Sequence, residues 1–108
     1  MKLVACEILI PVVSDRTRQP FPDDVVQAWE LQLAEKFGGY TRRGTVSGVW
    51  RDEQGQLVGD ESACYLVAVG PAQLDDLRAF ARAACETFDQ RCIYFQIVGQ
   101  AELLYPEE

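Results

Sequence analysis

The stretch from Asp23 to Arg51, DDVVQAWELQLAEKFGGYTRRGTVSGVWR, contains the change of hydrophobic period that decides the fold. In its first half, apolar residues recur at spacings of three and four, the period of one face of an α-helix. These residues are Val26, Trp29, Leu33 and Phe37. Gly38 and Gly39 follow, and glycine commonly ends a helix because it tolerates the left-handed backbone conformation. Residues 40–51 have the period of two and the composition of a strand, so the stretch predicts a helix followed by a strand.

The neighbouring segments extend this pattern to a hairpin and a central strand. Residues 52–55 are a predicted turn, and residues 56–69 are its second strand. Gly44 and Gly48 inside the first arm indicate a bulge or a sharp bend. The segment from Lys2 to Val13 is apolar on both alternating faces, which is typical of a strand in the middle of a sheet.

The second half of the chain repeats the helix and the strand. Gly70 and Pro71 begin a helix, because proline fits the first helical position without losing a hydrogen bond. Cys92 to Val98 is the last full predicted strand, and Gly99 ends it. The apolar segment from Ala101 to Tyr105 could add a short fifth strand or reach a partner chain. The predicted buried stripe of the second helix consists of Leu74, Leu77, Ala81, Ala84 and Phe88.

The predicted order is therefore strand, helix, strand, strand, helix, strand. Right-handed connections place both helices on one face of a four-stranded antiparallel sheet. The fold class is α+β, of the ferredoxin-like βαββαβ type. Residues 1–108 fit one domain of ordinary size.

Three short motifs resemble those of a known group of proteins. They are the helix end Phe37-Gly38-Gly39-Tyr40-Thr41, the strand segment Gly48-Val49-Trp50 and the closing segment from Ile93 to Glu102. With these motifs, the chain from about Asp23 onward resembles small bacterial ferredoxin-like proteins of unknown function, similar to dimeric α+β barrels and in some cases carried on mobile elements. The resemblance implies the same fold and a dimer, and it transfers no catalytic residue.

Charge and hydropathy exclude several function classes. With 17 acidic and 10 basic residues, the chain has a net charge of −7, which repels a phosphate backbone. The pair Arg42-Arg43 is too small a basic patch to offset this charge, so no nucleic-acid partner is expected. The longest apolar runs are strand-sized, far below the roughly 20 residues of a membrane helix. Because the first residues also lack the features of a signal peptide, we expect a cytoplasmic protein with no membrane partner.

The titratable residues do not form a known catalytic or metal motif. The sequence contains no histidine, which removes the usual general base near neutral pH and the commonest metal ligand. The four cysteines have no C-x-x-C spacing, and each occurs in an apolar pattern typical of a small packed side chain. We therefore expect no metal and no cofactor. The cysteines are Cys6, Cys64, Cys85 and Cys92.

The sheet face away from the helices is the expected functional surface. An apolar patch on a small domain usually marks an interface, so we expect a homodimer through this open face with a cavity between the two sheets. Glu7 stands out there, because a carboxylate in a central strand is costly unless it is paired or faces a polar pocket. An aromatic-lined site around it would suit a small cationic or hydrogen-bonding ligand. The predicted ligand-binding residues are Glu7, Trp50, Tyr65, Tyr94 and Gln96.

Glu7 and Trp50 also have a structural interpretation. Glu7 could be solvated, or could pair across subunits with Arg42, Arg43 or Arg51. Trp50 fits a pocket mouth and packing beneath the hairpin equally well, whereas Trp29 is expected in the core.

Three functions remain open at this point. The favoured one is a small-molecule-binding or regulatory dimer without catalytic residues. The second is a cofactor-independent enzyme of the dimeric α+β barrel type, in which Tyr65, Tyr94 or Glu7 would be the acid or base. The third is an acidic protein-interaction module that uses the hairpin from Arg42 to Val69.

Overall fold

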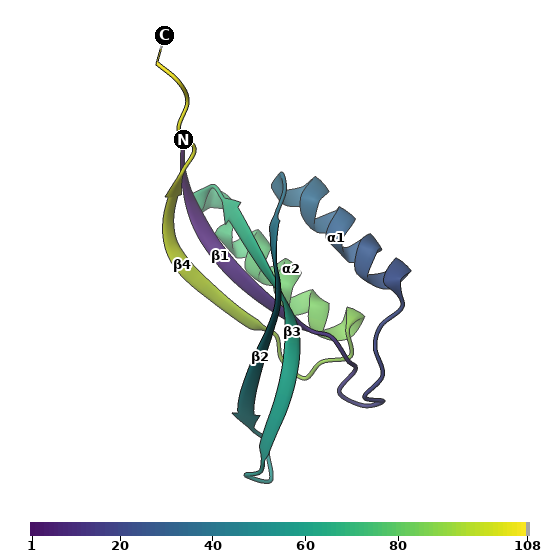
Figure 1. Cartoon of the computed structure of the whole chain (residues 1–108). Helices are drawn as coiled ribbons and strands as arrows, with labels where there is room; N and C mark the ends of the chain where they lie inside the picture. Colours follow the sequence, from purple (N-terminus) through teal and green to yellow (C-terminus); the bar gives the residue numbers. More distant parts are fainter. Residues whose placement is uncertain (108) are drawn as a thin grey trace.

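The computed structural model describes residues 1–107. Four strands and two helices alternate along the chain in the predicted order (Figure 1). The elements are β1 (Lys2–Pro11), α1 (Asp23–Phe37), β2 (Thr41–Arg51), β3 (Leu57–Val69), the 3-10 turn η1 (Pro71–Gln73), α2 (Leu74–Thr87) and β4 (Tyr94–Glu102).

All neighbouring strands in the sheet are antiparallel, in the order β2-β3-β1-β4. Both helices lie on one face of the sheet, and no helix of residues 1–107 covers the other face (Figure 1). This arrangement confirms the ferredoxin-like fold class. None of the helices within residues 1–107 is long and apolar enough to cross a membrane.

The core fills the space between the sheet and the two helices. Trp29 of α1 lies at its centre, with 5% of its surface exposed, which confirms its predicted burial. Its ring contacts those of Tyr65, Phe80 and Phe88 at centroid distances of 5.1 to 5.6 Å. Aromatic pairs at such spacings add to the stability gained from burial. The remaining buried core residues are Cys6, Ile8, Ile10, Leu33, Phe37, Ala63, Val67, Val69, Leu77, Ala81 and Ala84.

Glycines end one helix and shape two strands. Gly38 follows α1 with φ of 87°, the left-handed conformation that the glycine pair predicts. Gly44, with φ of 83°, lies in an irregularity of β2 between Arg42 and Thr45, which confirms the predicted bulge. Gly99 does not end the last strand as predicted, because β4 bulges near it and continues to Glu102.

The apolar segment after Gly99 does not form a separate fifth strand. Ala101 and Glu102 are the end of β4 and pair with the start of β1. From Leu103 to Tyr105 the chain has no regular structure, apart from a hydrogen bond from the Leu103 N–H to the Met1 carbonyl. The sheet within residues 1–107 therefore has four strands.

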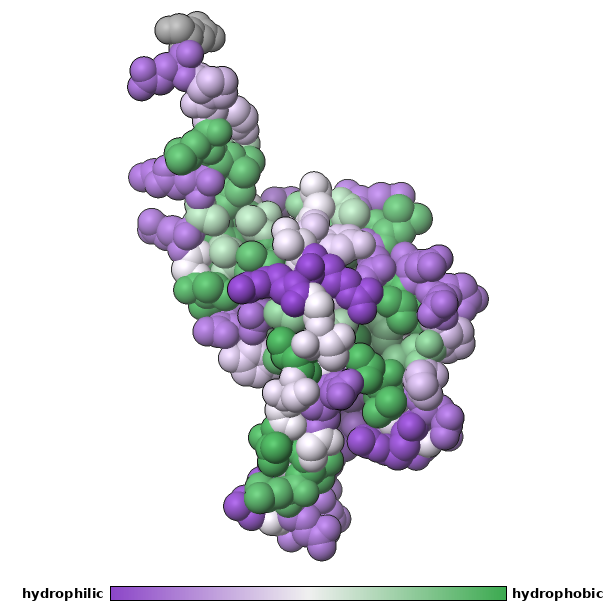
Figure 2. All heavy atoms as spheres, in the orientation of Figure 1, coloured by the Kyte–Doolittle hydropathy of each residue, from purple (hydrophilic) through white to green (hydrophobic). Residues whose placement is uncertain are grey.

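The molecule is elongated, with principal extents of 57 × 29 × 23 Å. The hairpin of β2 and β3 projects beyond the helices at one end, and residues 103–107 project at the other (Figure 1). Every residue of β2 is exposed. Hydrophobic side chains gather on the projecting hairpin (Figure 2). Among the hairpin residues, Val49 and Leu57 are each about two thirds exposed (70% and 67%).

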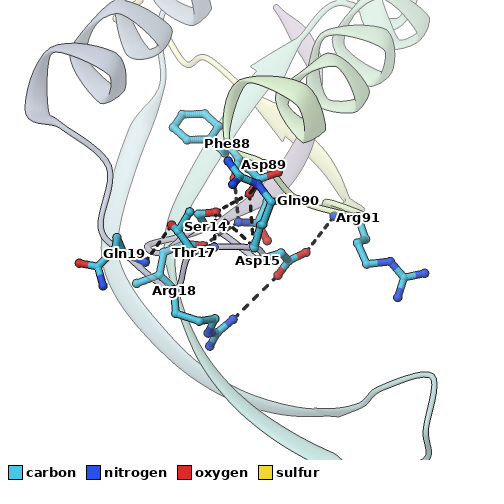
Figure 3. Close-up of polar contacts among 11 residues, drawn as sticks. Ser14, Asp15, Thr17, Arg18, Gln19, Phe88, Asp89, Gln90 and Arg91 are labelled. Atoms are coloured by element: carbon cyan, nitrogen blue, oxygen red, sulfur yellow. Dashed lines mark hydrogen bonds and ion pairs between the residues drawn. The ribbon is translucent and has the colours of Figure 1, made fainter.

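Two loops on the hairpin side are joined by hydrogen bonds around one carboxylate (Figure 3). The Ser14 hydroxyl donates to Oδ2 of Asp89, and the Arg16 backbone N–H donates to the same oxygen at 3.2 Å. These donors lower the pKa of Asp89, the Ser14 hydroxyl most, because they stabilise its charged form. The loop after β1 is thereby fixed to the loop after α2.

Candidate functional site

The open face of the sheet contains a cavity of about 770 Å³ at its hairpin end. We call this cavity the trough. Ligand pockets in proteins commonly have volumes of about 300–1,000 Å³, so the trough is large enough for a small organic molecule. Its lining consists of Leu9, Pro11, Val13, Asp15, Arg18, residues 46–53, Asp60, Ser62, residues 90–92 and Tyr94.

Strand register explains which side chains reach the floor of the trough. Residues directly opposite one another on paired strands point to the same face. Ser62 of β3 is opposite both Pro11 of β1 and Val46 of β2. Leu9 of β1 is opposite Tyr94 of β4. The floor is therefore apolar apart from the Ser62 hydroxyl. Tyr94 stands on one side of it, and Trp50 stands on the other, two residues from Gly48 on the same face of β2.

The loop before β4 forms the wall of the trough opposite the hairpin, and hydrogen bonds hold this loop in place. Gln90 is 8% exposed, and its Nε2 donates to the carbonyls of Val13 at 2.7 Å and Phe88 at 2.8 Å. The Arg91 backbone N–H donates to Oδ2 of Asp15 at 2.9 Å. The Arg91 side chain extends away from Asp15 (Figure 3).

Each of the three guanidinium groups around the trough already has a partner. Arg91 forms an ion pair with Glu53 in the hairpin turn, which connects the two sides of the cavity. Arg18 approaches Asp15 at 4.0 Å. The Arg51 guanidinium donates to the backbone carbonyl of Gly55 at 2.5 Å. Two of these three positive charges are therefore paired with carboxylates, and the third, on Arg51, is hydrogen-bonded to a neutral carbonyl.

The carboxylate of Asp60 differs from the other acidic groups of the trough. Asp52 accepts hydrogen bonds from the backbone N–H groups of Gln54 and Gln56, and so belongs to the hairpin turn. Asp60 is half-buried, and its carboxylate makes no hydrogen bond or ion pair with any other residue in the range 1–107. Nothing in the sequence singles Asp60 out, because Asp60 and Glu61 are adjacent carboxylates on opposite faces of a strand. Its position opposite Gly48 in the hairpin was the signal that could have identified it.

Four of the five predicted ligand-binding residues lie on the open face. Trp50 and Tyr94 line the trough, with 40% and 53% of their surfaces exposed. The Tyr94 hydroxyl donates to Oε1 of Gln96 at 3.0 Å, and Gln96 is opposite Glu7 in the register of β1 and β4. Glu7 and Gln96 thus continue the open face beyond the trough without lining it.

Glu7 has a close neighbour in Cys64 of β3. Burial raises the pKa of the Cys64 thiol, and the Glu7 carboxylate raises it further through its charge and by accepting a hydrogen bond. The positive charge of Arg43 acts in the opposite direction. Cys64 is therefore held as a neutral thiol and is not an activated nucleophile.

The predicted position of Tyr65 in the open-face group is wrong. Tyr65 is opposite Ile8 and points toward the helices, with 1% of its surface exposed. Its hydroxyl donates to Oε2 of Glu30 at 2.6 Å, and Arg42 contacts the same oxygen at 3.3 Å. Burial and this carboxylate raise the pKa of Tyr65 well above its ordinary value. The residue is part of the core and does not reach the trough.

The cysteines also differ in part from the prediction. Cys6 and Cys64 are buried as expected, and Cys85 is partly buried. Cys92 is exposed and lines the trough, because the strand begins only at Tyr94 and leaves it in a loop. Within residues 1–107, no group of three or more potential metal ligands converges.

Comparison with known proteins supports the fold. No family model and no curated protein sequence matches the chain. The divalent cation tolerance protein Cut A1 from Thermus thermophilus is similar in structure, with a TM-score of 0.60 and 13% identity, covering 99% of this chain and 88% of that one. A phage SAM lyase in complex with S-methyl-5'-thioadenosine is also similar, with a TM-score of 0.62 and 16% identity, covering 90% of this chain and 82% of that one.

Proposed function

We propose that this protein is a homodimeric domain that binds a small organic molecule in the trough of its open face. The observation that carries the proposal is a cavity of about 770 Å³ with an apolar floor, two exposed aromatic side chains and charged groups around its rim. This combination is typical of small-molecule sites, in which apolar contacts supply affinity and a few polar groups supply orientation.

The exposed aromatic residues support binding more than they support stability. Trp50 and Tyr94 stand on opposite sides of the trough, and neither contributes to the helix-covered core. Large aromatic side chains that remain exposed around a concave site are suited to stacking on a planar ring system. A dimer that covers the open face would enclose such a ring and bury the apolar surface around it.

The phage SAM lyase supplies a first probe. That protein was solved with S-methyl-5'-thioadenosine, a molecule with a planar base, a ribose and an apolar thioether. We propose a ligand of this general kind for the trough, in which the base would stack on Trp50 or Tyr94 and hydroxyl groups would bond to Ser62 or to a carboxylate.

Thermal unfolding in the presence of S-methyl-5'-thioadenosine tests this proposal. Ligand at a hundredfold excess over its Kd stabilises a protein by about 2.7 kcal/mol. For a domain of this size, each kcal/mol corresponds to about 4–8 °C in the unfolding midpoint. At that excess we therefore expect a rise of about 10 °C or more in the wild-type protein. The absence of any shift at millimolar nucleoside would contradict the proposed ligand class.

A matched pair of tyrosine variants locates the site. Tyr94→Ala removes an aromatic wall of the trough, whereas Tyr105→Ala removes an exposed ring of similar accessibility (68% exposed) outside it. We expect the ligand-induced shift to be lost in the first variant and kept in the second. An unchanged shift in Tyr94→Ala would place the ligand elsewhere on the protein.

For the alternative of a cofactor-independent enzyme, one of the three candidate acid or base residues is no longer available. Tyr65 would have to exchange a proton with a substrate, yet its hydroxyl is buried and bonded to Glu30. Tyr94 and Glu7 remain on the open face, where the Tyr94 hydroxyl donates to the amide oxygen of Gln96, a group that does not act as a base in proton transfer. Binding without chemistry is therefore the function that we favour.

A further inference from the structure

The hairpin strands leave an opening beside a carboxylate in the trough. Gly48 of β2 is directly opposite Asp60 of β3, and both positions face the trough. A Cβ at position 48 would be in van der Waals contact with Oδ1 of Asp60, at 3.4 Å, so the carboxylate borders the space that a side chain would fill. The glycine thus gives a ligand access to the carboxylate from the β2 side.

An aromatic ring lies next to this opening. Trp50 follows Gly48 by two residues on the same face, and it is therefore diagonal to Asp60 across the strand pair. Diagonal neighbours in an antiparallel pair are about 7–8 Å apart, which is within reach of an aromatic side chain. A group bound over Gly48 would contact both the Asp60 carboxylate and the Trp50 ring.

The charges around the trough favour a cation at this position. The lining contains four carboxylates and three guanidinium groups. The guanidinium groups contact Glu53, Asp15 and the Gly55 carbonyl, whereas the Asp60 carboxylate has no hydrogen-bond or ion-pair partner among residues 1–107. A half-buried carboxylate beside an indole ring provides both charge attraction and a cation–π contact.

We propose that Asp60, Gly48 and Trp50 form a subsite for an organic monocation, such as a quaternary ammonium, alkylammonium or sulfonium group. The inference rests on the proposed function, since it assigns the charged part of the ligand that occupies the trough. It differs from the sequence-based expectation, which placed a cation at Glu7. Glu7 lies outside the trough and is opposite Gln96 and Leu66.

Titration with choline against its neutral isostere 3,3-dimethylbutan-1-ol tests the subsite. The readout is the indole N–H signal of Trp50 in a ¹H–¹⁵N spectrum, assigned by its loss in Trp50→Phe. At constant ionic strength we expect choline to move this signal saturably, with an affinity about tenfold or more above that of the alcohol. A factor of ten corresponds to a cation–π contact combined with one partly screened charge.

Charge variants supply the matched control. Asp60→Asn removes the carboxylate of the subsite. Glu35→Gln removes an exposed carboxylate on α1, which lies on the other side of the sheet from the trough. Both variants change the net charge equally. We expect choline affinity to fall about tenfold in Asp60→Asn and to stay unchanged in Glu35→Gln. Equal loss in the two variants, or no loss in Asp60→Asn, would overturn the subsite.

The result also separates this inference from the proposed function. If the neutral alcohol binds as well as choline while the nucleoside still raises the unfolding midpoint, the trough binds ligands but Asp60 does not select cations. If neither choline nor the nucleoside binds, the proposed function fails together with the subsite.

Discussion

Tyr65 and Trp50 are aromatic residues on adjacent strands, and they lie on opposite faces of the sheet. The difference arises from the bulge in β2, which adds one residue between Arg42 and Thr45 against β3. Before the bulge the even-numbered Arg42 faces the helices beside Tyr65, whereas after it Val46 faces the trough. A single extra residue reverses the alternation of side chains along a strand.

The alternation could be predicted from the sequence only where no bulge intervenes. The faces of Glu7, Tyr94 and Gln96 follow from period-two patterns, and the structure places these residues together as expected. Gly44 signals the bulge, but the sequence does not say how many residues it adds. The positions of Trp50 and Tyr65 therefore depended on pairing that only the folded sheet defines.

At the residue scale, Tyr65→Phe tests the corrected role of this tyrosine. The variant removes the donor to Glu30, a carboxylate whose side chain is only 14% exposed. We expect the free energy of unfolding to fall by about 1–3 kcal/mol, because a buried charged group loses a hydrogen bond. Urea denaturation measures this loss. Ligand binding in the trough should be unchanged, and a stable variant that no longer binds would contradict the assignment.

Among the elements, the helices were the most predictable and the ends of the strands the least. The apolar stripes of α1 and α2 coincide with their buried faces, because a helix must turn its stripe toward the only core available. The extent of β4 was misjudged at Gly99. That glycine has φ of 153° and lies beside a bulge, so it bends the strand and permits pairing up to Glu102.

The connections between elements were not predictable, and one of them supports the trough. Asp89 and Ser14 are 75 residues apart in the sequence. Their hydrogen bond joins the loop after β1 to the loop after α2, in which Gln90 and Arg91 form one wall of the trough. Each residue alone has the polarity of an ordinary loop. Only the packing of α2 against β1 brings them together.

This connection predicts a dependence of stability on pH. The pKa of Asp89 is lower in the folded protein than its ordinary value, chiefly because the Ser14 hydroxyl donates to it. Its carboxylate therefore stabilises the fold above the pKa of an unfolded aspartate, about 3.9, and this contribution is lost as the pH falls through the lower folded value. We expect wild-type protein to exceed Asp89→Asn in stability at pH 6, with the difference shrinking below about pH 4. Chemical denaturation at each pH measures it, and a difference that grows with acidity would contradict the role of the carboxylate.

At the scale of the whole molecule, the exposed apolar surface is the main feature that one chain leaves unexplained. The projecting hairpin and the rim of the trough carry apolar side chains that no other part of residues 1–107 covers. Exposed apolar patches on small domains commonly mark interfaces. The net charge of −7 opposes nonspecific association, so a specific, closed assembly is the favoured way to cover this surface.

The solution mass tests the proposed dimer. Light scattering coupled to size-exclusion chromatography should give about twice the 12.1 kDa of one chain. Substitution of Val49 and Leu57 by Ser then tests whether the hairpin contributes to the dimer interface. Both side chains are exposed in the single chain, so their loss should barely change its stability. A wild-type protein that remains monomeric at high concentration would contradict the dimer and leave the apolar surface without a function.

The central claim is that the trough on the open face binds a small molecule. The most direct measurement is an amide chemical-shift map of ¹⁵N-labelled protein titrated with the thioether nucleoside and, separately, with choline. If the trough binds these molecules, saturable shifts are expected mainly at residues 46–51, 60–62 and 90–94, around the cavity. The amides of Glu30 and Tyr65 on the helix side should stay in place. Trough amides that remain unshifted with both molecules, or shifts confined to the helix side, would contradict the claim.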